Sequence, residues 1–228
     1  MRKKIWLTAL TAAALLAGGT TPALADENNS GDVLAFIENG EGELIRLDDA
    51  FDTNLGLEQP PAAGEEDVAT PYLINFDQWF RCFSLSQKYE VFGEYAFFLS
   101  NDNWQDVRLK CGEHNSVTNT GFGYKHIRAR HEADWQSKYD AARNAGWNAD
   151  AQGLEGWDDL MHAGAQQSLT FPTYYSGIKG NNTRCAVGRL VFINVQSGQI
   201  VYSMGVTSAF AVNSDRLISS YPSSGTTC

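Results

Sequence analysis

The chain of 228 residues contains few prolines, methionines and cysteines: six, three and four, respectively. After residue 17, no segment approaches 18 uninterrupted apolar residues, so we expect no membrane anchor. Neither the Cys-x-x-Cys spacing of zinc and redox sites nor the Gly-x-Ser-x-Gly elbow of serine hydrolases occurs. The sequence therefore predicts no bound metal or cofactor, and the chemistry must come from other side chains.

The first 25 residues have the pattern of a signal peptide. Arg2, Lys3 and Lys4 precede an apolar run from residue 5 to about residue 17, and Ala-Leu-Ala follows at residues 23–25. We therefore expect a secreted, extracellular protein.

In an oxidising compartment, an even number of cysteines predicts disulfides. Three pairings are possible in principle, and we prefer the two local ones. These join Cys82 to Cys111 and Cys185 to Cys228.

Charge divides the chain into two parts. Residues 26–70 contain thirteen acidic side chains and one basic one, Arg46, whereas residues 71–228 contain fourteen acidic and thirteen basic. The first part predicts a disordered acidic leader with at most one short strand, near residues 33–37. Such a leader either solubilises the protein or shields a cationic site. The second part is long enough for one folded domain.

Periodicity within residues 71–228 predicts an α+β fold in a single domain, with N-terminal helices packed on a C-terminal antiparallel meander. Two paired strands are expected at residues 95–99 and 106–110. A helix is expected from about residue 124 to residue 139 or beyond, and another at residues 156–167. Four short strands follow, at residues 189–195, 199–203, 206–212 and 216–221.

Cationic and imidazole side chains cluster just after a Gly-Phe-Gly turn at residues 121–123. A helix that begins near Tyr124 presents unpaired N–H groups in its first turn, which favour anions such as phosphate. The cluster comprises Lys125, His126, Arg128, Arg130 and His131.

The two histidines of this cluster differ in their expected surroundings. Being five residues apart, they leave the helix about 140° from each other and cannot bind one metal ion together. His126 falls on the polar face and suits acid–base work. His131 shares the apolar stripe with Ile127 and Trp135, which favours a hydrogen-bonded structural histidine over a catalytic one. His114 and His162 have no companion motif.

The last expected strand carries a second candidate group. Alternation places Leu217, Ser219 and Tyr221 on one face, and Ile218 and Ser220 on the other. A hydroxyl and a phenol then point in the same direction, two residues apart.

These two motifs, Lys125-His126 and Ile218-Ser219-Ser220-Tyr221-Pro222, occur in an order that resembles the barnase, EndoU, colicin E5/D and RelE-like superfamily of toxin ribonucleases. The likeness is greatest to colicin D-like and contact-dependent-inhibition toxin tips. The resemblance implies metal-independent cleavage of RNA by attack of a 2′-OH on its own phosphodiester. It assigns acid–base work to His126, phosphate stabilisation to Lys125 with Arg128 or Arg130, and hydrogen bonds to Ser219 and Tyr221. His131 is a further catalytic candidate, and Arg184 and Arg189 are candidates for contacts with the RNA backbone.

The resemblance also implies RNA as a partner, and an immunity or inhibitor protein as a possible second one. We expect a monomer. Two features depart from the pattern: the near-neutral charge of residues 71–228, and four cysteines that would be a liability in a reducing cytosol. The alternative is a non-catalytic binding module on the same fold, which uses exposed aromatic side chains among Trp147, Trp157, Tyr174 and Tyr175.

Overall fold

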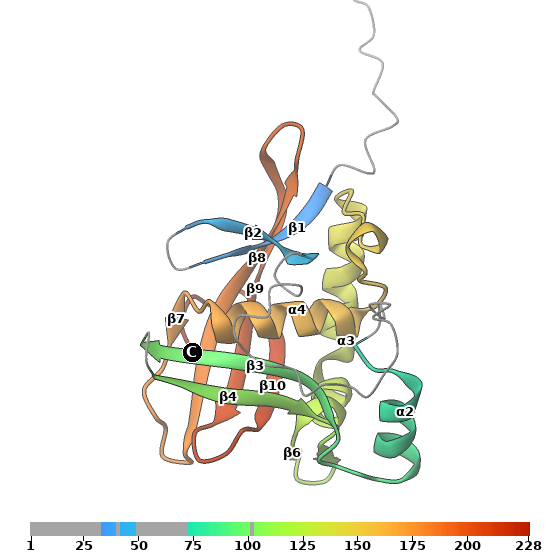
Figure 1. The fold of residues 1–228 in the computed structure, drawn as a ribbon, viewed down its shortest axis with the longest axis vertical. Coiled ribbons are helices and arrows are strands. Elements are labelled where there is room, and N and C mark those ends of the chain that lie inside the picture. The colour runs from blue at the N-terminus through green and yellow to red at the C-terminus, as the bar shows by residue number, and fades with distance from the viewer. Residues whose placement is uncertain (1–32, 40–41, 49–72, 101–102) are drawn as a thin grey trace, which may run out of the picture.

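The computed structural model describes residues 33–39, 42–48, 73–100 and 103–228, and the expected signal peptide lies outside them. The chain has a mixed α+β fold (Figure 1). The helices are α2 (Phe76–Trp79), the π-helix η1 (Phe80–Ser84), α3 (Gly123–Asn144), the 3₁₀ turn η2 (Asp150–Gln152) and α4 (Trp157–Thr170). The strands are β1 (Val33–Glu38), β2 (Leu44–Arg46), β3 (Val91–Ser100), β4 (Asn103–Lys110), β5 (Glu113–Asn115), β6 (Thr120–Phe122), β7 (Tyr174–Tyr175), β8 (Thr183–Asn194), β9 (Gln199–Ala211) and β10 (Leu217–Ser223).

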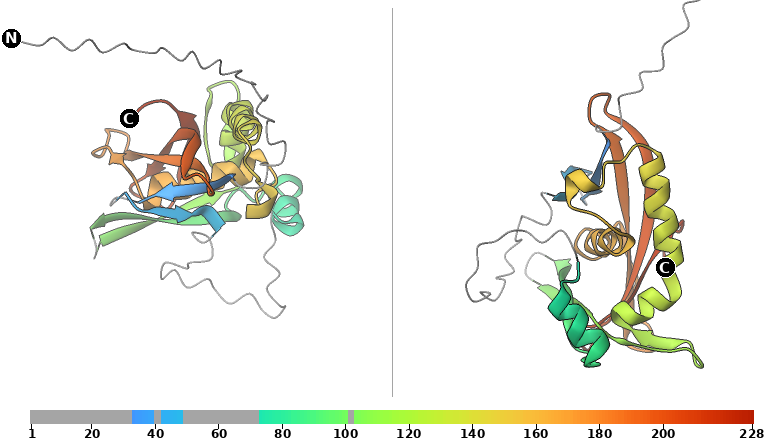
Figure 2. Two further views of the ribbon diagram at one scale, coloured as in Figure 1. Left: turned by 90° about the horizontal axis from the view of Figure 1, so that it is seen from above. Right: turned by 90° about the vertical axis from the view of Figure 1, so that its right-hand side faces the viewer.

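The largest sheet has the strand order β10-β9-β8-β1-β2, with β7 paired to β8, and its neighbouring strands are antiparallel. Helix α4 packs on β8 and β9, and it also contacts β3 of the separate β3–β4 ribbon. Helix α3 runs along the β10 side of the sheet (Figure 2). Because strands from both ends of the chain enter this sheet, it is not a simple C-terminal meander, and the helices are not confined to the N-terminal side.

In the described part of the leader, the short strand expected near residues 33–37 is present as β1, and a second strand, β2, follows it, so this part is folded and not disordered. Strand β1 lies between β2 and β8, and its Val33, Ala35 and Ile37 side chains are buried in the core. Gln152 holds the strand further, because its side chain accepts a hydrogen bond from the Ala35 amide at 2.7 Å and donates one to the Ala35 carbonyl at 3.1 Å. Period-two burial of apolar side chains thus outweighs the acidic composition.

The helix and ribbon predictions are confirmed. Helix α3 starts at Gly123, α4 spans Trp157–Thr170, and β3 pairs with β4 so that Tyr95 lies opposite Val107. One expected turn is absent, because β9 continues through Met204 and Gly205. A side chain at Gly205 would meet the Ser223 carbonyl oxygen at 2.6 Å, so this glycine allows close approach of β10 instead of forming a turn.

Both preferred cysteine pairings are at disulfide distance. The Cα–Cα distance is 5.5 Å for Cys82–Cys111 and 6.2 Å for Cys185–Cys228. The first joins the α2–η1 segment to the end of β4, and the second joins β8 to the C-terminal residues. Within the described ranges, no helix is long and apolar enough to cross a membrane.

Candidate functional site

The candidate site forms where the β5–β6 hairpin meets the first turn of α3. The hairpin pairs His114 with Gly121, and α3 starts two residues later. Gly121 has φ 156°, and a side chain there would meet the Glu113 carbonyl oxygen at 2.1 Å. A glycine is therefore required opposite His114, and the hairpin folds back tightly onto the helix.

This folding brings His114 and His126 into contact. Their Nδ1 atoms lie 3.2 Å apart and their ring centroids 5.3 Å apart, so one ring donates a hydrogen bond to the other. Among the described residues, neither Nε2 atom has a hydrogen-bond partner. Partial burial lowers the pKa of His126, and the nearby His114, His131 and Arg130 lower it further, which favours the neutral form of its ring.

An open groove with a volume of about 810 Å³ lies between the β5–β6 hairpin and β10. Arg216 reaches it from the start of β10, where its guanidinium carbon lies 5.0 Å from the centre of the Phe122 ring. The groove is lined by Glu113, His114, Asn115, Ser116, Thr120, Gly121, Phe122, Arg216 and Ile218. One imidazole and one guanidinium therefore face a space that can hold an anionic group.

A β-bulge in β10 changes which side chains share a face, so the expected alternation of Leu217 with Ser219 and Tyr221 is wrong for Leu217. Leu217 lies opposite Phe210, whereas Ser219 lies opposite Ala209, so Ile218 is the extra residue. Side chains of directly opposed residues share a face, and therefore Leu217 lies on the face of Ser220. The Ser220 hydroxyl accepts a hydrogen bond from Ser208 at 3.1 Å on that face, and the Ser208 hydroxyl accepts one from Ser168 of α4 at 2.7 Å.

Ser219 and Tyr221 do share the other face, as expected, since they lie opposite Ala209 and Thr207. The Tyr221 ring stacks on His131, with centroids 5.0 Å apart and 25° between the planes. Ser219 is 7% exposed, and its hydroxyl has no hydrogen-bond partner among the described residues. His131 also contacts Asp134, with 3.0 Å between Nδ1 and Oδ2. His131 therefore packs against Tyr221, and the His131 ring is still partly exposed to solvent.

The cations of the cluster spread over two sides of α3. Arg130 is exposed and near enough to His126 to lower its pKa. Lys125 instead turns to the η1 side, where its ammonium donates to the Cys82 carbonyl at 3.0 Å and lies 5.3 Å from the Phe83 ring centre. Arg128 also lies over Phe83 and pairs with Glu132. The structure thus does not bring Lys125 into the groove.

The two remaining arginines lie elsewhere. The guanidinium carbon of Arg184 lies 5.5 and 5.6 Å from the ring centres of Phe97 and Tyr175, and exposed Arg189 donates to the Ser203 hydroxyl. Neither belongs to the groove lining. Among the aromatic residues of the alternative interpretation, Trp147 is buried, Trp157 is half-buried, and only Tyr174 and Tyr175 are exposed.

Sequence reasoning missed two members of the site, His114 and Arg216. The signal available for His114 was the short hairpin pattern around Asn-Thr-Gly-Phe-Gly, which returns the chain to the helix that carries His126. Within residues 33–39, 42–48, 73–100 and 103–228, no three histidine, cysteine or acidic side chains are placed to hold one metal ion.

Comparisons of the chain with protein-family models, with curated proteins and with solved structures gave no match.

Proposed function

We propose that the protein is an endoribonuclease that cleaves RNA by attack of a 2′-OH on the adjacent phosphodiester, without a metal ion. The observation that carries this proposal is the His114–His126 contact, with its Nδ1–Nδ1 distance of 3.2 Å, beside a groove that also contains Arg216. Two adjacent imidazoles supply the base and the acid that this reaction needs at neutral pH.

In the proposed reaction, neutral His126 takes the 2′-OH proton at its free Nε2. The O2′–P bond forms as the P–O5′ bond breaks, and His114 gives a proton from its Nε2 to O5′. The Nδ1 contact passes a proton from His126 to His114, so the pair ends with the charge with which it began. The products are a 2′,3′-cyclic phosphate and a 5′-OH.

Charge that develops on the non-bridging phosphate oxygens requires cations and hydrogen-bond donors. Arg216 in the groove and exposed Arg130, one helical turn after His126, are the cations best located for this work. On the neighbouring strand, the unpartnered hydroxyl of Ser219 and the phenol of Tyr221 are the proposed donors. Lys125 acts from the other side of the helix, and His131 acts by holding Tyr221.

We further propose that the enzyme works outside the reducing cytosol, because two disulfides join its elements. The test of the function is incubation of the purified, disulfide-bonded protein with single-stranded and structured RNA in EDTA. Fragments that end in a 2′,3′-cyclic phosphate are expected. If no RNA is cleaved, or if cleavage requires a divalent metal, the proposal fails and the groove is an anion-binding site only.

A further inference from the structure

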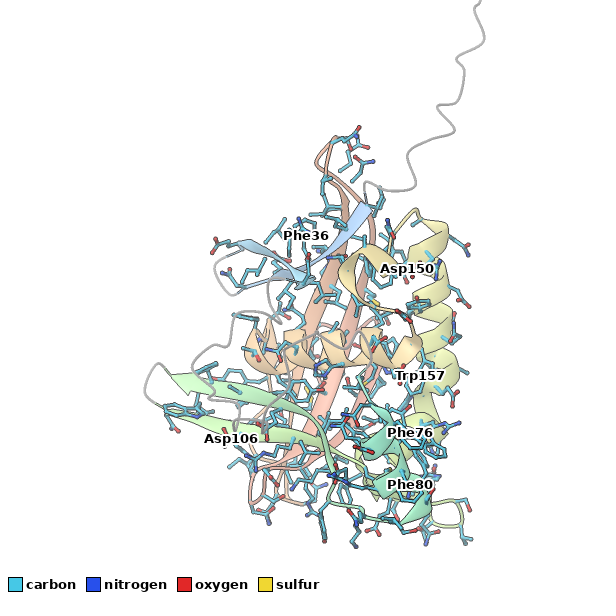
Figure 3. The ribbon with its side chains drawn as sticks, turned by 45° about the vertical axis from the view of Figure 1, so that its right-hand side comes forward. Phe36, Phe76, Phe80, Asp106, Asp150 and Trp157 are labelled. Carbon is cyan, nitrogen blue, oxygen red and sulfur yellow. A yellow bond between two sulfur atoms is a disulfide. The ribbon has the colours of Figure 1, made fainter. Side chains whose placement is uncertain are left out.

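A second surface lies across α3 from the groove. It consists of Phe76, Trp79 and Phe80, which we call the aromatic platform, and Figure 3 shows Phe76 and Phe80 on the segment that lies beside α3. The Phe76 and Trp79 side chains are 74% and 46% exposed, respectively. The Phe76 ring stacks on the rings of Trp79 and Phe80, at centroid distances of 6.4 Å and angles of 20° and 21°.

The aromatic platform is held in place by polar contacts. Asn75 caps α2 by accepting a hydrogen bond from the Gln78 amide, and the Gln78 side chain accepts one from the Asn75 amide in return. The Gln78 side chain also donates to the Val91 carbonyl of β3 at 2.9 Å. Adjacent Cys82 is tied to Cys111. These contacts restrain the segment of α2 and η1 that carries the exposed rings.

Two cations, Lys125 and Arg128, lie between the aromatic platform and the histidine pair. The Trp79 ring lies 5.6 Å from that of Phe83, and Phe83 in turn lies beneath Lys125 and Arg128, at 5.3 and 5.8 Å. Lys125 and His126 are successive residues, whose side chains leave the helix about 100° apart. Arg128 forms a surface ion pair with Glu132, an interaction weak enough to exchange for a phosphate.

We propose that the aromatic platform binds unpaired bases of single-stranded RNA that flank the cleaved phosphodiester, with Lys125 and Arg128 on the intervening phosphates. The proposal rests on the proposed ribonuclease function. Exposed rings beside cations are the combination that binds single strands through stacking and phosphate contact. A purely apolar protein partner would make no use of the two cations beside the rings, whereas the phosphates of RNA would pair with both, so we favour RNA.

The first measurement uses full-length, disulfide-bonded His126→Ala protein, which we expect to bind RNA without cleaving it. Fluorescence anisotropy with a labelled single-stranded oligoribonucleotide of about twelve nucleotides gives Kd. Adding Phe76→Ala and Trp79→Ala should weaken binding about 10- to 100-fold. The matched control is Trp104→Ala, an exposed tryptophan (55%) at the opposite end of the β3–β4 ribbon, which should leave Kd unchanged. Circular dichroism melts verify that all variants fold.

The second measurement separates this proposal from the function on which it rests. With His126 intact, rates are compared for a dinucleotide and for the longer oligonucleotide. The cleavage rate of the oligonucleotide is divided by that of the dinucleotide. This ratio should fall in the Phe76→Ala, Trp79→Ala variant and stay constant in Trp104→Ala. If the dinucleotide is cleaved but the ratio and Kd are both unchanged, the aromatic platform does not bind RNA, while the ribonuclease function is still supported. The aromatic platform is then a surface for a protein partner. If no RNA is cleaved at all, the proposed ribonuclease function is wrong. Even then, weaker RNA binding by the Phe76→Ala, Trp79→Ala variant would support stacking of bases on the aromatic platform.

Discussion

Trp135 donates its indole N–H to the carbonyl of Ser220 at 3.0 Å, and both residues are buried. This bond ties the middle of α3 to the strand that carries Ser219 and Tyr221. One turn earlier on the same helix, His131 stacks on Tyr221. The helix and β10 are therefore fixed to each other by one buried hydrogen bond and one ring contact, and this fixes the candidate donors relative to the histidine pair.

Substitutions at His131 and Tyr221 should affect different properties: the first the free energy of unfolding, the second the cleavage rate. His131→Ala removes the ring contact and should lower the free energy of unfolding by about 0.5–1.5 kcal/mol. Tyr221→Phe keeps the ring and removes only the hydroxyl, so we expect an unchanged melt. Its cleavage rate should fall by the equivalent of about 1.5–3 kcal/mol, the value of a hydrogen bond to a charged phosphate. Thermal melts and initial rates test both, and a full rate in Tyr221→Phe would remove the phenol from the site.

Strand β1 should be essential for stability. Ile37 is fully buried in the core, so Ile37→Ala should lower the free energy of unfolding by about 2–5 kcal/mol. Leu44→Ala on neighbouring β2, where the side chain is exposed, is the control and should change it by less than about 0.5 kcal/mol. A chain that starts at residue 71 should lose its cooperative melt. An unchanged midpoint for that chain would mean that β1 contributes nothing to the fold.

Buried His162 should make stability depend on pH. Burial lowers its pKa from 6.5 to about 4, and its Nδ1 lies 2.7 Å from the Tyr95 hydroxyl. Because the unfolded chain binds a proton at a higher pH than the folded chain, stability rises with pH between about 4 and 6.5 and is lost on acidification through this window. The full effect is on the order of 3 kcal/mol.

The measurement is urea unfolding of wild type and of His162→Gln at several pH values. Glutamine keeps a polar partner for Tyr95 but does not titrate, so the difference between the two proteins isolates His162 from the carboxylates. We expect wild type to lose stability relative to the variant as the pH falls from 6.5 to 4. Parallel curves would show that His162 is not held neutral by the fold.

The Cys82–Cys111 disulfide should matter more for activity than the Cys185–Cys228 disulfide. The carbonyls of Cys82 and Cys111 accept hydrogen bonds from the side chain and the backbone amide of Lys125, at 3.0 and 2.9 Å. This disulfide therefore restrains the residue before His126. Serine substitutions of either pair should destabilise by about 2–5 kcal/mol. At a temperature where both variants are folded, only loss of Cys82–Cys111 should slow cleavage, and equal rates would exclude this coupling.

Sequence patterns predicted α3, α4 and the β3–β4 ribbon because their periodicity is local. The even number of cysteines predicted disulfides, and the preference for local pairs agrees with the two pairings at disulfide distance. The bulge at Ile218 could not be predicted, since one extra residue leaves no mark on the composition of a strand. The His114–His126 contact depends on how tightly a hairpin closes, and Gly121 allows this closure because any side chain there would collide with the Glu113 carbonyl oxygen. A short strand near residues 33–37 was allowed for, and β1 lies there, but its place between β2 and β8 was not expected, because the surrounding acidic residues indicate disorder.

The most direct test of the central claim is a double-mutant cycle on the histidine pair. Cleavage rates in EDTA are measured for wild type, His114→Ala, His126→Ala and the double variant, with His162→Gln as the control for an imidazole outside the site. Each single substitution within the pair should slow cleavage by about 10²- to 10⁴-fold. Because the two rings act on one proton path, the double variant should be little slower than either single variant. A full rate in His114→Ala or His126→Ala would contradict the account.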